Sequence, residues 1–126
     1  MLTVICPIYN EEQYIVECME SILRQDYPKD DLEVIFVDGM STDGTRALVA
    51  DYAAQYPFIH LLDNPKRIVP TALNTAIRVA KGDLVARIDA HAKYPDNYLS
   101  VLASRSSGNR SRRSTGRSRT PSRSTT

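Results

Sequence analysis

Residues 32–45 read LEVIFVDGMSTDGT, and this stretch decides the fold. Its first six residues are almost all apolar, which is typical of a β-strand that is covered on both faces. Small and polar residues follow from Asp38 to Gly44 and predict a turn-rich loop. The residues after this loop predict a helix over 45–55. A buried strand, a polar loop and a helix in this order are the repeating unit of α/β proteins.

The same unit recurs on both sides of this stretch. Apolar runs predict three further strands, over residues 2–8, 58–62 and 83–88. Three further helices are predicted, which begin near Glu11, Pro70 and Pro95 and end near Asp26, Gly82 and Ala103. The helix that follows Pro70 is expected to bury one apolar face, made of Leu73, Ala76, Ile77 and Ala80. The alternation predicts an α/β domain with a mostly parallel, Rossmann-like sheet of about four strands and flanking helices.

Charge divides the chain at Ala103. The net charge of +1 over 126 residues combines two unlike segments. Residues 1–103 hold all 15 acids and nine of the 16 basic residues, a net charge of −6. Residues 104–126 hold seven Arg, no acid and no aliphatic or aromatic residue. Because such a segment cannot bury enough apolar surface to fold, we predict one domain over residues 1–103 and a disordered Arg/Ser-rich tail over 104–126.

The composition excludes several classes of protein. No run of 18 apolar residues is present, so no membrane-spanning helix is predicted. The N-terminus has no basic segment, and Glu11 and Glu12 interrupt the apolar run that a secretion signal needs. We therefore expect a cytoplasmic protein, with peripheral attachment to the cytoplasmic face of the membrane left open. Cys6 and Cys18 are too few for a disulfide framework, and we expect two buried thiols.

Chemically useful residues follow the predicted strands, where ligands bind in parallel sheets. Tyr9 offers a ring face or a hydroxyl, and Asp38 can accept a hydrogen bond from a base N–H or a ribose hydroxyl. Lys66 and Arg67, in the loop before the third helix, can pair with phosphate oxygens. These residue types together suit a nucleoside diphosphate.

An Asp-x-His pair ends the fourth predicted strand. Asp89 and His91 could place an oxygen and a nitrogen on one divalent cation, which would neutralise a diphosphate leaving group. A carboxylate suits Mg²⁺ or Mn²⁺, and an imidazole favours Mn²⁺. The sequence therefore predicts a Mn²⁺ or Mg²⁺ site.

Each of these segments also has a purely structural interpretation. Residues 41–44 can be a turn and the start of the following helix. Glu11 and Glu12 fit the first turn of a helix, where the helix dipole favours carboxylates. Lys66 and Arg67 are compatible with a solvated loop, and an isolated Asp-x-His pair is weak evidence for a metal.

Three stretches form a recognisable pattern when they are taken together, and they read VICPIYNEEQYIVECMESILRQDYP, LEVIFVDGMSTDGT and NPKRIVPTALNTAIRVAKGDLVARIDAH. This pattern resembles that of family 2 glycosyltransferases of the GT-A fold. Their order and spacing match over about residues 2–102, and the Asp-Ala-His-x-x-Tyr-Pro ending is most similar to succinoglycan-type exopolysaccharide glucosyltransferases. The resemblance implies a GT-A nucleotide-sugar-binding half-domain. It also implies inverting transfer of a sugar, from a UDP-linked donor to a saccharide or lipid-linked saccharide, in polysaccharide biosynthesis.

The resemblance also assigns residue roles. In the family, the segment holding Pro7 and Tyr9 and the Asp that ends the second strand, here Asp38, line the nucleoside pocket. Asp89 with His91 stands in the place of the D-x-D motif, which holds the metal and the diphosphate. Position 39 is Gly, where many members have a second Asp, so base recognition is expected to rest more on Asp38.

The resemblance stops at about Leu102. Family members continue with an acceptor-binding half that supplies the general base, whereas residues 104–126 contain no Asp, Glu or His. No catalytic base can therefore be named, and we expect an incomplete enzyme, weakly active or inactive alone, with a tail that follows a truncation or a frame shift. The alternative is a non-catalytic binding module whose basic tail attaches to RNA or an anionic surface without sequence specificity. A dinucleotide oxidoreductase is disfavoured, because no G-x-G-x-x-G follows the first strand.

Overall fold

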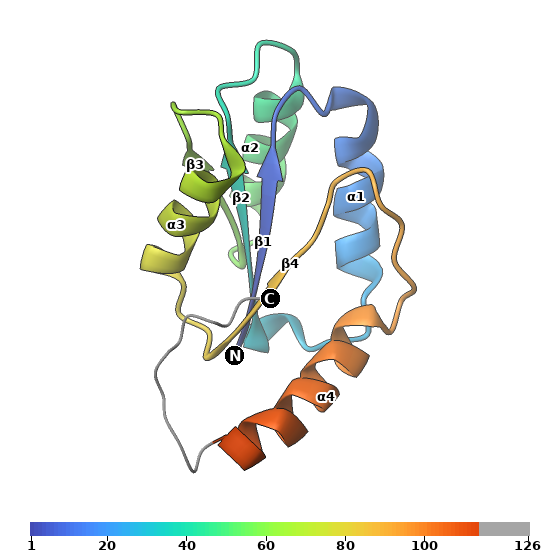
Figure 1. Cartoon of the computed structure of the whole chain (residues 1–126). Helices are drawn as coiled ribbons and strands as arrows, with labels where there is room; N and C mark the ends of the chain where they lie inside the picture. Colours follow the sequence, from blue (N-terminus) through green and yellow to red (C-terminus); the bar gives the residue numbers. More distant parts are fainter. Residues whose placement is uncertain (114–126) are drawn as a thin grey trace.

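The computed structural model describes the backbone of residues 1–113 and the side chains of residues 1–105. Strands and helices alternate along this part of the chain (Figure 1). In chain order the elements are β1 (Leu2–Ile8), α1 (Glu12–Arg24), a short 3-10 turn η1 (Lys29–Asp31), β2 (Leu32–Asp38), α2 (Thr45–Gln55), β3 (Ile59–Asp63), α3 (Val69–Val79), β4 (Leu84–Arg87) and α4 (Tyr98–Arg113).

The strands form one parallel sheet in the order β3-β2-β1-β4. At the carboxyl end of the sheet, Ile8 of β1 lies opposite Asp38 of β2, and Asp38 lies opposite Asp63 of β3. The chain moves from β1 to β3 in one direction and then returns to place β4 on the other side of β1. The predicted fold class is confirmed, and the winding direction reverses between β1 and β4.

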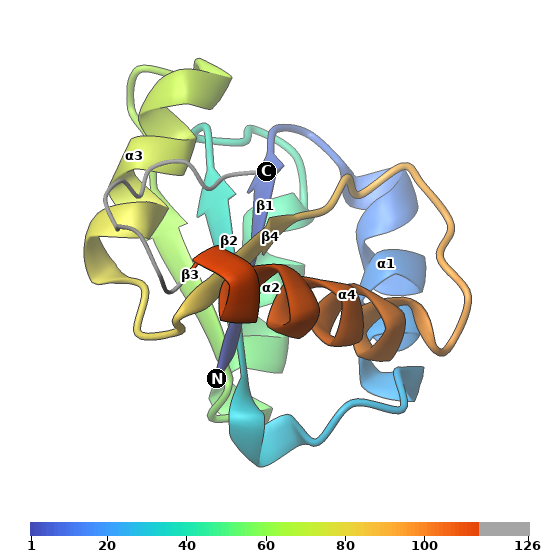
Figure 2. The ribbon, with the colours of Figure 1, turned by 60° about the horizontal axis from the view of Figure 1, so that its bottom comes forward.

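Helices cover both faces of the sheet (Figures 1 and 2). The larger core joins the sheet to α1, α2 and α4 and includes Phe36, Met19 and Leu99. The smaller core, on the opposite face, joins the sheet to Ala72 and Ala76 of α3. All seven residues of β2 are buried, as its apolar sequence predicts, and each large side chain buried there contributes roughly 1.5–3 kcal/mol.

Most element bounds agree with the sequence predictions. β1 and α2 have the predicted bounds, β3 is shifted by one residue, and β4 is shorter than predicted at both ends. Cys6 and Cys18 are free and buried, as expected. Among the described residues, no helix is both long enough and apolar enough to cross a membrane.

The end of α3 differs from the prediction. The helix stops at Val79, three residues before Gly82, and the intervening Ala80 is extended. Gly82 is required by space, because a Cβ there would lie 2.5 Å from Thr3 Oγ1 and 2.7 Å from the carbonyl oxygen of Met1. A close approach between the α3–β4 turn and β1, rather than a helix cap, explains this glycine.

The buried face of α3 is also narrower than predicted. Ile77, expected in the core, is 49% exposed, whereas Ala72 and Ala76 are buried. The helix contacts the sheet through these two small residues, and small side chains let it approach closely. Spacing predicted the periodicity of the face correctly but not its width.

The last helix crosses the predicted domain boundary. α4 begins at Tyr98, after a turn in which the Tyr98 N–H donates to the carbonyl of Pro95 (3.0 Å), and it continues to Arg113. Residues 104–113 are therefore helical, where the composition predicted no regular structure. Leu99 anchors the start of the helix in the core, and the helix extends beyond its apolar part. Residues 114–126, the remainder of the predicted tail, lie outside the described part of the chain.

Candidate functional site

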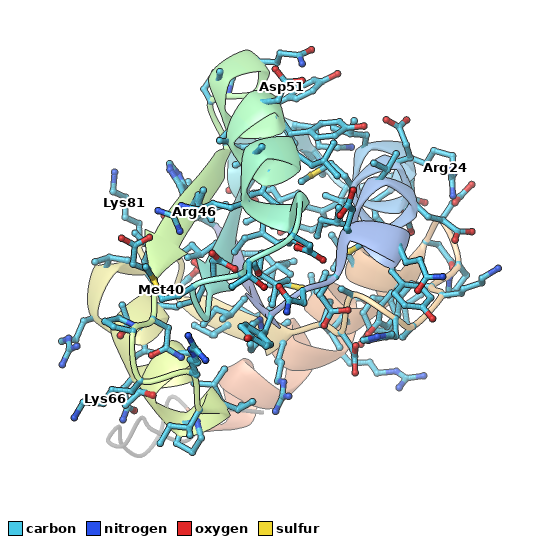
Figure 3. The ribbon with its side chains drawn as sticks, turned by 90° about the horizontal axis from the view of Figure 1, so that it is seen from above. Arg24, Met40, Arg46, Asp51, Lys66 and Lys81 are labelled. Atoms are coloured by element: carbon cyan, nitrogen blue, oxygen red, sulfur yellow. The ribbon has the colours of Figure 1, made fainter. Side chains whose placement is uncertain are left out.

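The carboxyl ends of the strands bring the predicted site residues to one edge of the sheet, seen from above in Figure 3. Three non-glycine residues here have a left-handed backbone: Asn10 (φ 51°), Met40 (φ 66°) and Arg67 (φ 64°). They follow β1, β2 and β3 respectively. Such conformations are costly for non-glycine residues and cluster at functional sites, so the strained backbone marks this edge independently of the side chains.

Tyr9 and Arg67 form one half of the site. The guanidinium carbon of Arg67 lies 5.3 Å from the centre of the Tyr9 ring, a cation–π contact. Gly39 lies between them, where a Cβ would be 3.4 Å from Tyr9 Cδ1 and 3.5 Å from Arg67 Cα. Both side chains are exposed, whereas Gly39 is buried beside them. Lys66 is exposed too and lies at the outer side of this edge, beside α3 (Figure 3).

Asp38 is turned into the protein rather than toward this space. Its side chain is fully buried, and its carboxylate accepts hydrogen bonds from the Ser41 backbone N–H (3.1 Å), the Ser41 hydroxyl and Arg46 Nη1 (3.0 Å). In this geometry Asp38 holds the loop that follows β2. Pro7, the remaining predicted nucleoside residue, is half-buried within β1 opposite Val37.

Arg46 is a site residue that the sequence reasoning missed. Its guanidinium contacts Asp63 as well as Asp38, and so joins the ends of β2 and β3. The hydrogen bonds to Asp63 and Asp38 raise the pKa of Arg46 above its usual value. A cation in the first turn of a helix is repelled by the helix dipole. The position of Arg46 near the start of α2 could therefore have indicated that it has carboxylate partners elsewhere.

The loops after β1 and β2 are joined by hydrogen bonds. Asn10 Oδ1 accepts from the backbone N–H groups of Thr42 (2.8 Å) and Asp43 (3.3 Å), and the Gly44 N–H donates to Glu12 Oε1 (2.9 Å). These contacts favour the structural interpretation of residues 41–44. They also show that Glu12 does more than begin a helix, because it anchors the loop that precedes α2.

Asp89 and His91 meet on the other side of β1. Asp89 Oδ1 accepts from the His91 backbone N–H (3.0 Å) and lies 3.3 Å from His91 Nδ1. The Asp89 N–H donates to the Tyr94 hydroxyl (3.0 Å), which fixes the backbone after β4. The backbone hydrogen bond from His91 lowers the pKa of Asp89, so this largely exposed carboxylate is ionised at neutral pH.

Glu11 corrects the sequence interpretation. It occupies the N-cap position of α1, yet its side chain makes no capping hydrogen bond. Instead, Glu11 Oε1 lies 3.0 Å from His91 Nε2, and the Tyr14 ring packs against the imidazole with centroids 4.4 Å apart. Burial raises the pKa of Glu11, and the nearby His91 partly offsets this shift.

Asp89 and His91 fit a divalent cation as a pair of adjacent ligands. Ligands at about 2.1 Å from an octahedral Mg²⁺ are roughly 3 Å apart, close to the 3.3 Å between Asp89 Oδ1 and His91 Nδ1. In the described part of the chain, no three His, Cys, Asp or Glu side chains form a metal-binding group. A cation would therefore take its other ligands from water and from a bound phosphate, as Mg²⁺ commonly does.

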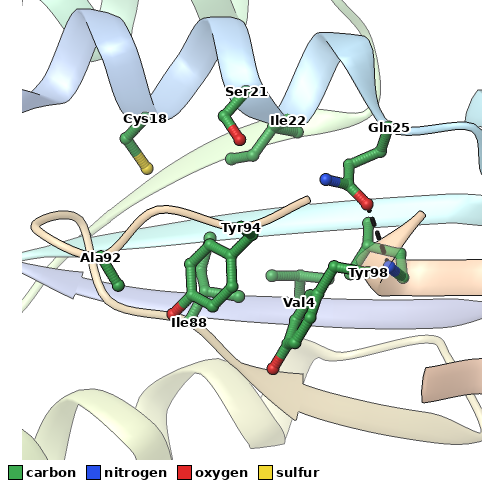
Figure 4. Close-up of a pocket in the computed structure, with 10 residues that line it drawn as sticks. Val4, Cys18, Ser21, Ile22, Gln25, Ile88, Ala92, Tyr94 and Tyr98 are labelled. Carbon is green, nitrogen blue, oxygen red and sulfur yellow. Dashed lines mark hydrogen bonds between the residues drawn. The ribbon is translucent and has the colours of Figure 1, made fainter. Parts of the chain in front are cut away.

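A separate pocket lies between β1, α1, the segment that follows β4 and the start of α4 (Figure 4). Its lining is mostly apolar and comprises Val4, Cys18, Ser21, Ile22, Gln25, Ile88, Ala92, Tyr94, Tyr98 and Leu99. Both ends of the Gln25 amide are bonded to the segment that leads into α4, because Nε2 donates to the carbonyl of Pro95 (2.7 Å) and Oε1 accepts from the Leu99 N–H (2.9 Å). The pocket thus belongs to the docking of α4 and not to the site.

The sequence of the chain matches a known family. The model of glycosyl transferase family 2 matches residues 3–119. The chain belongs to family 2. Succinoglycan biosynthesis protein ExoA of Rhizobium meliloti is 40% identical over 101 residues, which are 79% of this chain and 30% of ExoA. The resemblance inferred from the three sequence stretches is therefore confirmed.

Solved structures of relatives share the fold of this family 2 chain. S. aureus TarS 1–349 in complex with UDP-GlcNAc has a TM-score of 0.72 at 31% identity, over 82% of this chain and 30% of that one. The mannosyltransferase PcManGT from Pyrobaculum calidifontis, in complex with GDP-Man and Mn²⁺, has a TM-score of 0.69 at 44% identity, over 75% of this chain and 28% of that one. The chain spans about 30% of the length of these relatives.

Proposed function

We propose that this chain binds the donor in a sugar transfer from a nucleoside diphosphate sugar to an acceptor hydroxyl. The observation that carries the proposal is the meeting of Tyr9, Arg67, Asp89 and His91 at one sheet edge in a family 2 chain. The donor-binding unit is residues 1–103, and polysaccharide biosynthesis at the cytoplasmic face of the membrane is the setting. The acceptor is a saccharide or a lipid-linked saccharide.

Each residue has a task that follows from its position. Tyr9 and Arg67 present a ring face and a planar cation to the nucleoside, and Lys66 and Arg67 attract the phosphates. Asp38 shapes the pocket, together with Pro7, by fixing the loop after β2. Asp89 and His91 would hold Mn²⁺ or Mg²⁺, which neutralises the charge of the departing diphosphate. The inverting attack needs a general base, and we assign that role to no residue of this chain.

Binding of nucleotides by the full chain tests this proposal. Titration calorimetry with UDP, GDP, UDP-GlcNAc and GDP-Man, with and without Mn²⁺, should show cation-dependent binding of one nucleotide class. Asp89→Asn should remove the cation-dependent part. Asp51→Asn, the same change on the exposed surface of α2, should leave binding unchanged. Absence of heat with every nucleotide, in the presence of Mn²⁺, would overturn the proposal.

A further inference from the structure

The imidazole of His91 is held between two carboxylates that come from different strand ends. Asp89, after β4, faces Nδ1 at 3.3 Å, and Glu11, after β1, faces Nε2 at 3.0 Å. Tyr14, one turn into α1, packs against the ring itself. His91 thus has contacts on both nitrogens and on one ring face, although its side chain is about half exposed.

The two carboxylates differ in their surroundings. The Asp89 side chain is 62% exposed, so water and a cation can reach it, whereas that of Glu11 is only 13% exposed. Glu11 Oε1 is buried, and within the described residues no hydrogen-bond donor is aligned with it. A buried carboxylate oxygen needs a donor, and His91 Nε2, already 3.0 Å away, can supply one through a small rotation of the ring.

We infer that Glu11 is a positioning residue that accepts the Nε2–H of His91 and so makes Nδ1 the nitrogen that binds the cation. Histidines that ligate metals commonly donate their other ring N–H to a carboxylate, which fixes the tautomer and the orientation of the ring. Here that arrangement leaves the Nδ1 lone pair beside Asp89 Oδ1, at the spacing of two adjacent ligands. The inference rests on the proposed cation site, but the tautomer of His91 can be measured without any cation.

The Glu11 side chain is mostly buried against His91, and its carboxylate also accepts a hydrogen bond from the backbone N–H of Tyr9. It does not cap α1, and the contact between the loops after β1 and β2 uses the side chains of Asn10 and Glu12 instead. The strand order places Glu11 beside His91, because β4 returns next to β1 where the winding direction reverses. Nucleotide-binding sites occur where this reversal takes place in α/β sheets.

The experiment is a long-range ¹H–¹⁵N NMR spectrum of the imidazoles in the full, metal-free chain. The sequence has two histidines, His91 and the exposed His60 on β3, so His60 is an internal control and His91→Gln assigns the signals. We expect His91 in the Nε2–H tautomer. Glu11→Ala should abolish this preference and leave the His60 pattern unchanged. Glu11→Gln retains an acceptor oxygen and should preserve much of it.

A second measurement connects the tautomer to the cation. Mn²⁺ binding, followed by electron paramagnetic resonance in the presence of UDP or GDP, should weaken about 10- to 100-fold in Glu11→Ala, as for other carboxylates behind a metal-bound histidine. Glu17→Ala, an exposed residue of α1 that pairs with Lys93, is the matched control and should have no effect. If Glu11→Ala does not fold, Glu11→Asp withdraws the carboxylate by one methylene and serves the same purpose.

The outcomes separate this inference from the proposed function. An unchanged His91 tautomer in a folded Glu11 variant overturns the positioning role, whatever the chain binds. If the tautomer changes as expected but the wild-type chain binds no Mn²⁺ with any nucleotide, the proposed cation site is wrong. The contact between Glu11 and His91 is then still supported.

Discussion

The two halves of the site on either side of β1 are built differently. On the β2 side, the Asp38 carboxylate is buried and fully bonded, and Asn10 and Glu12 join two loops. On the β4 side, the Asp89 and His91 side chains are more than half exposed, and they contact each other and Glu11. The β2 side, where we propose that the nucleoside binds, is therefore held by its own hydrogen bonds and contributes to stability. The β4 side, where we propose that the cation binds, contributes less to stability and leaves the Asp89 carboxylate accessible.

The largest effect on stability is expected for Arg46→Met, which tests the hydrogen-bonded β2 side. The change leaves the Asp38 carboxylate buried without its cation, and we expect the free energy of unfolding to fall by roughly 3 kcal/mol, measured in urea. Asp38→Asn in the same chain should restore part of the loss. Arg24→Met removes an exposed ion pair with Asp96 and should cost less than about 1 kcal/mol. Equal losses of stability for the two arginine variants would contradict the difference between the buried and the exposed ion pair.

Two substitutions of Asn10, also on the β2 side, distinguish the contribution of its hydrogen bonds to stability from that of its backbone strain. Asn10→Ala loses the bonds to Thr42 and Asp43 and places an alanine at φ 51°, for an expected loss of about 2 kcal/mol. Asn10→Gly loses the same bonds without the strain and should cost about 1 kcal/mol. Thermal unfolding of the two variants measures the difference, and a glycine variant less stable than the alanine variant would refute this account.

The β4 side should respond in the opposite way. Asp89→Asn is expected to change the free energy of unfolding by no more than about 0.5 kcal/mol, because this side chain is 62% exposed. His91→Gln should cost up to about 1 kcal/mol, because it also alters the partner of the buried Glu11 carboxylate. The same variants should lose the cation-dependent part of nucleotide binding in calorimetry. A stability loss comparable to that of Arg46→Met would show that the two sides do not differ.

Gly39→Ala is expected to have the smallest effect on stability. The new Cβ would make ordinary contacts with Tyr9 and Arg67, and the backbone at Gly39 is not left-handed. The free energy of unfolding should therefore change by less than about 0.5 kcal/mol. Nucleotide affinity should nevertheless fall, because the methyl group enters the space between the two side chains. Unchanged affinity would place the nucleoside elsewhere.

The sequence predicted the position of the site better than its bonding. Apolar runs located the strands, and strand ends placed Tyr9, Asp38 and Asp89 at one edge. Sequence spacing does not determine rotamers, however, so it could not show that Asp38 turns inward. The partners of Arg46 and Glu11 lie on other strand ends, and no local pattern reports such contacts. The width of the buried face of α3 depended likewise on how closely that helix approaches the sheet.

The strand order also has a consequence for the order of assembly. Asn10 and Ser41 are 31 residues apart, whereas Glu11 and His91 are 80 residues apart and meet only after β4 has paired with β1. β4 contributes four paired residues to β1, and β2 contributes seven. Because closing a longer loop costs more entropy, we expect β4 to join a sheet that already contains β1, β2 and β3. A folding intermediate would thus possess the contacts between the loops after β1 and β2 while His91 still lacks Glu11, and the environment of His91 would report the last step of folding.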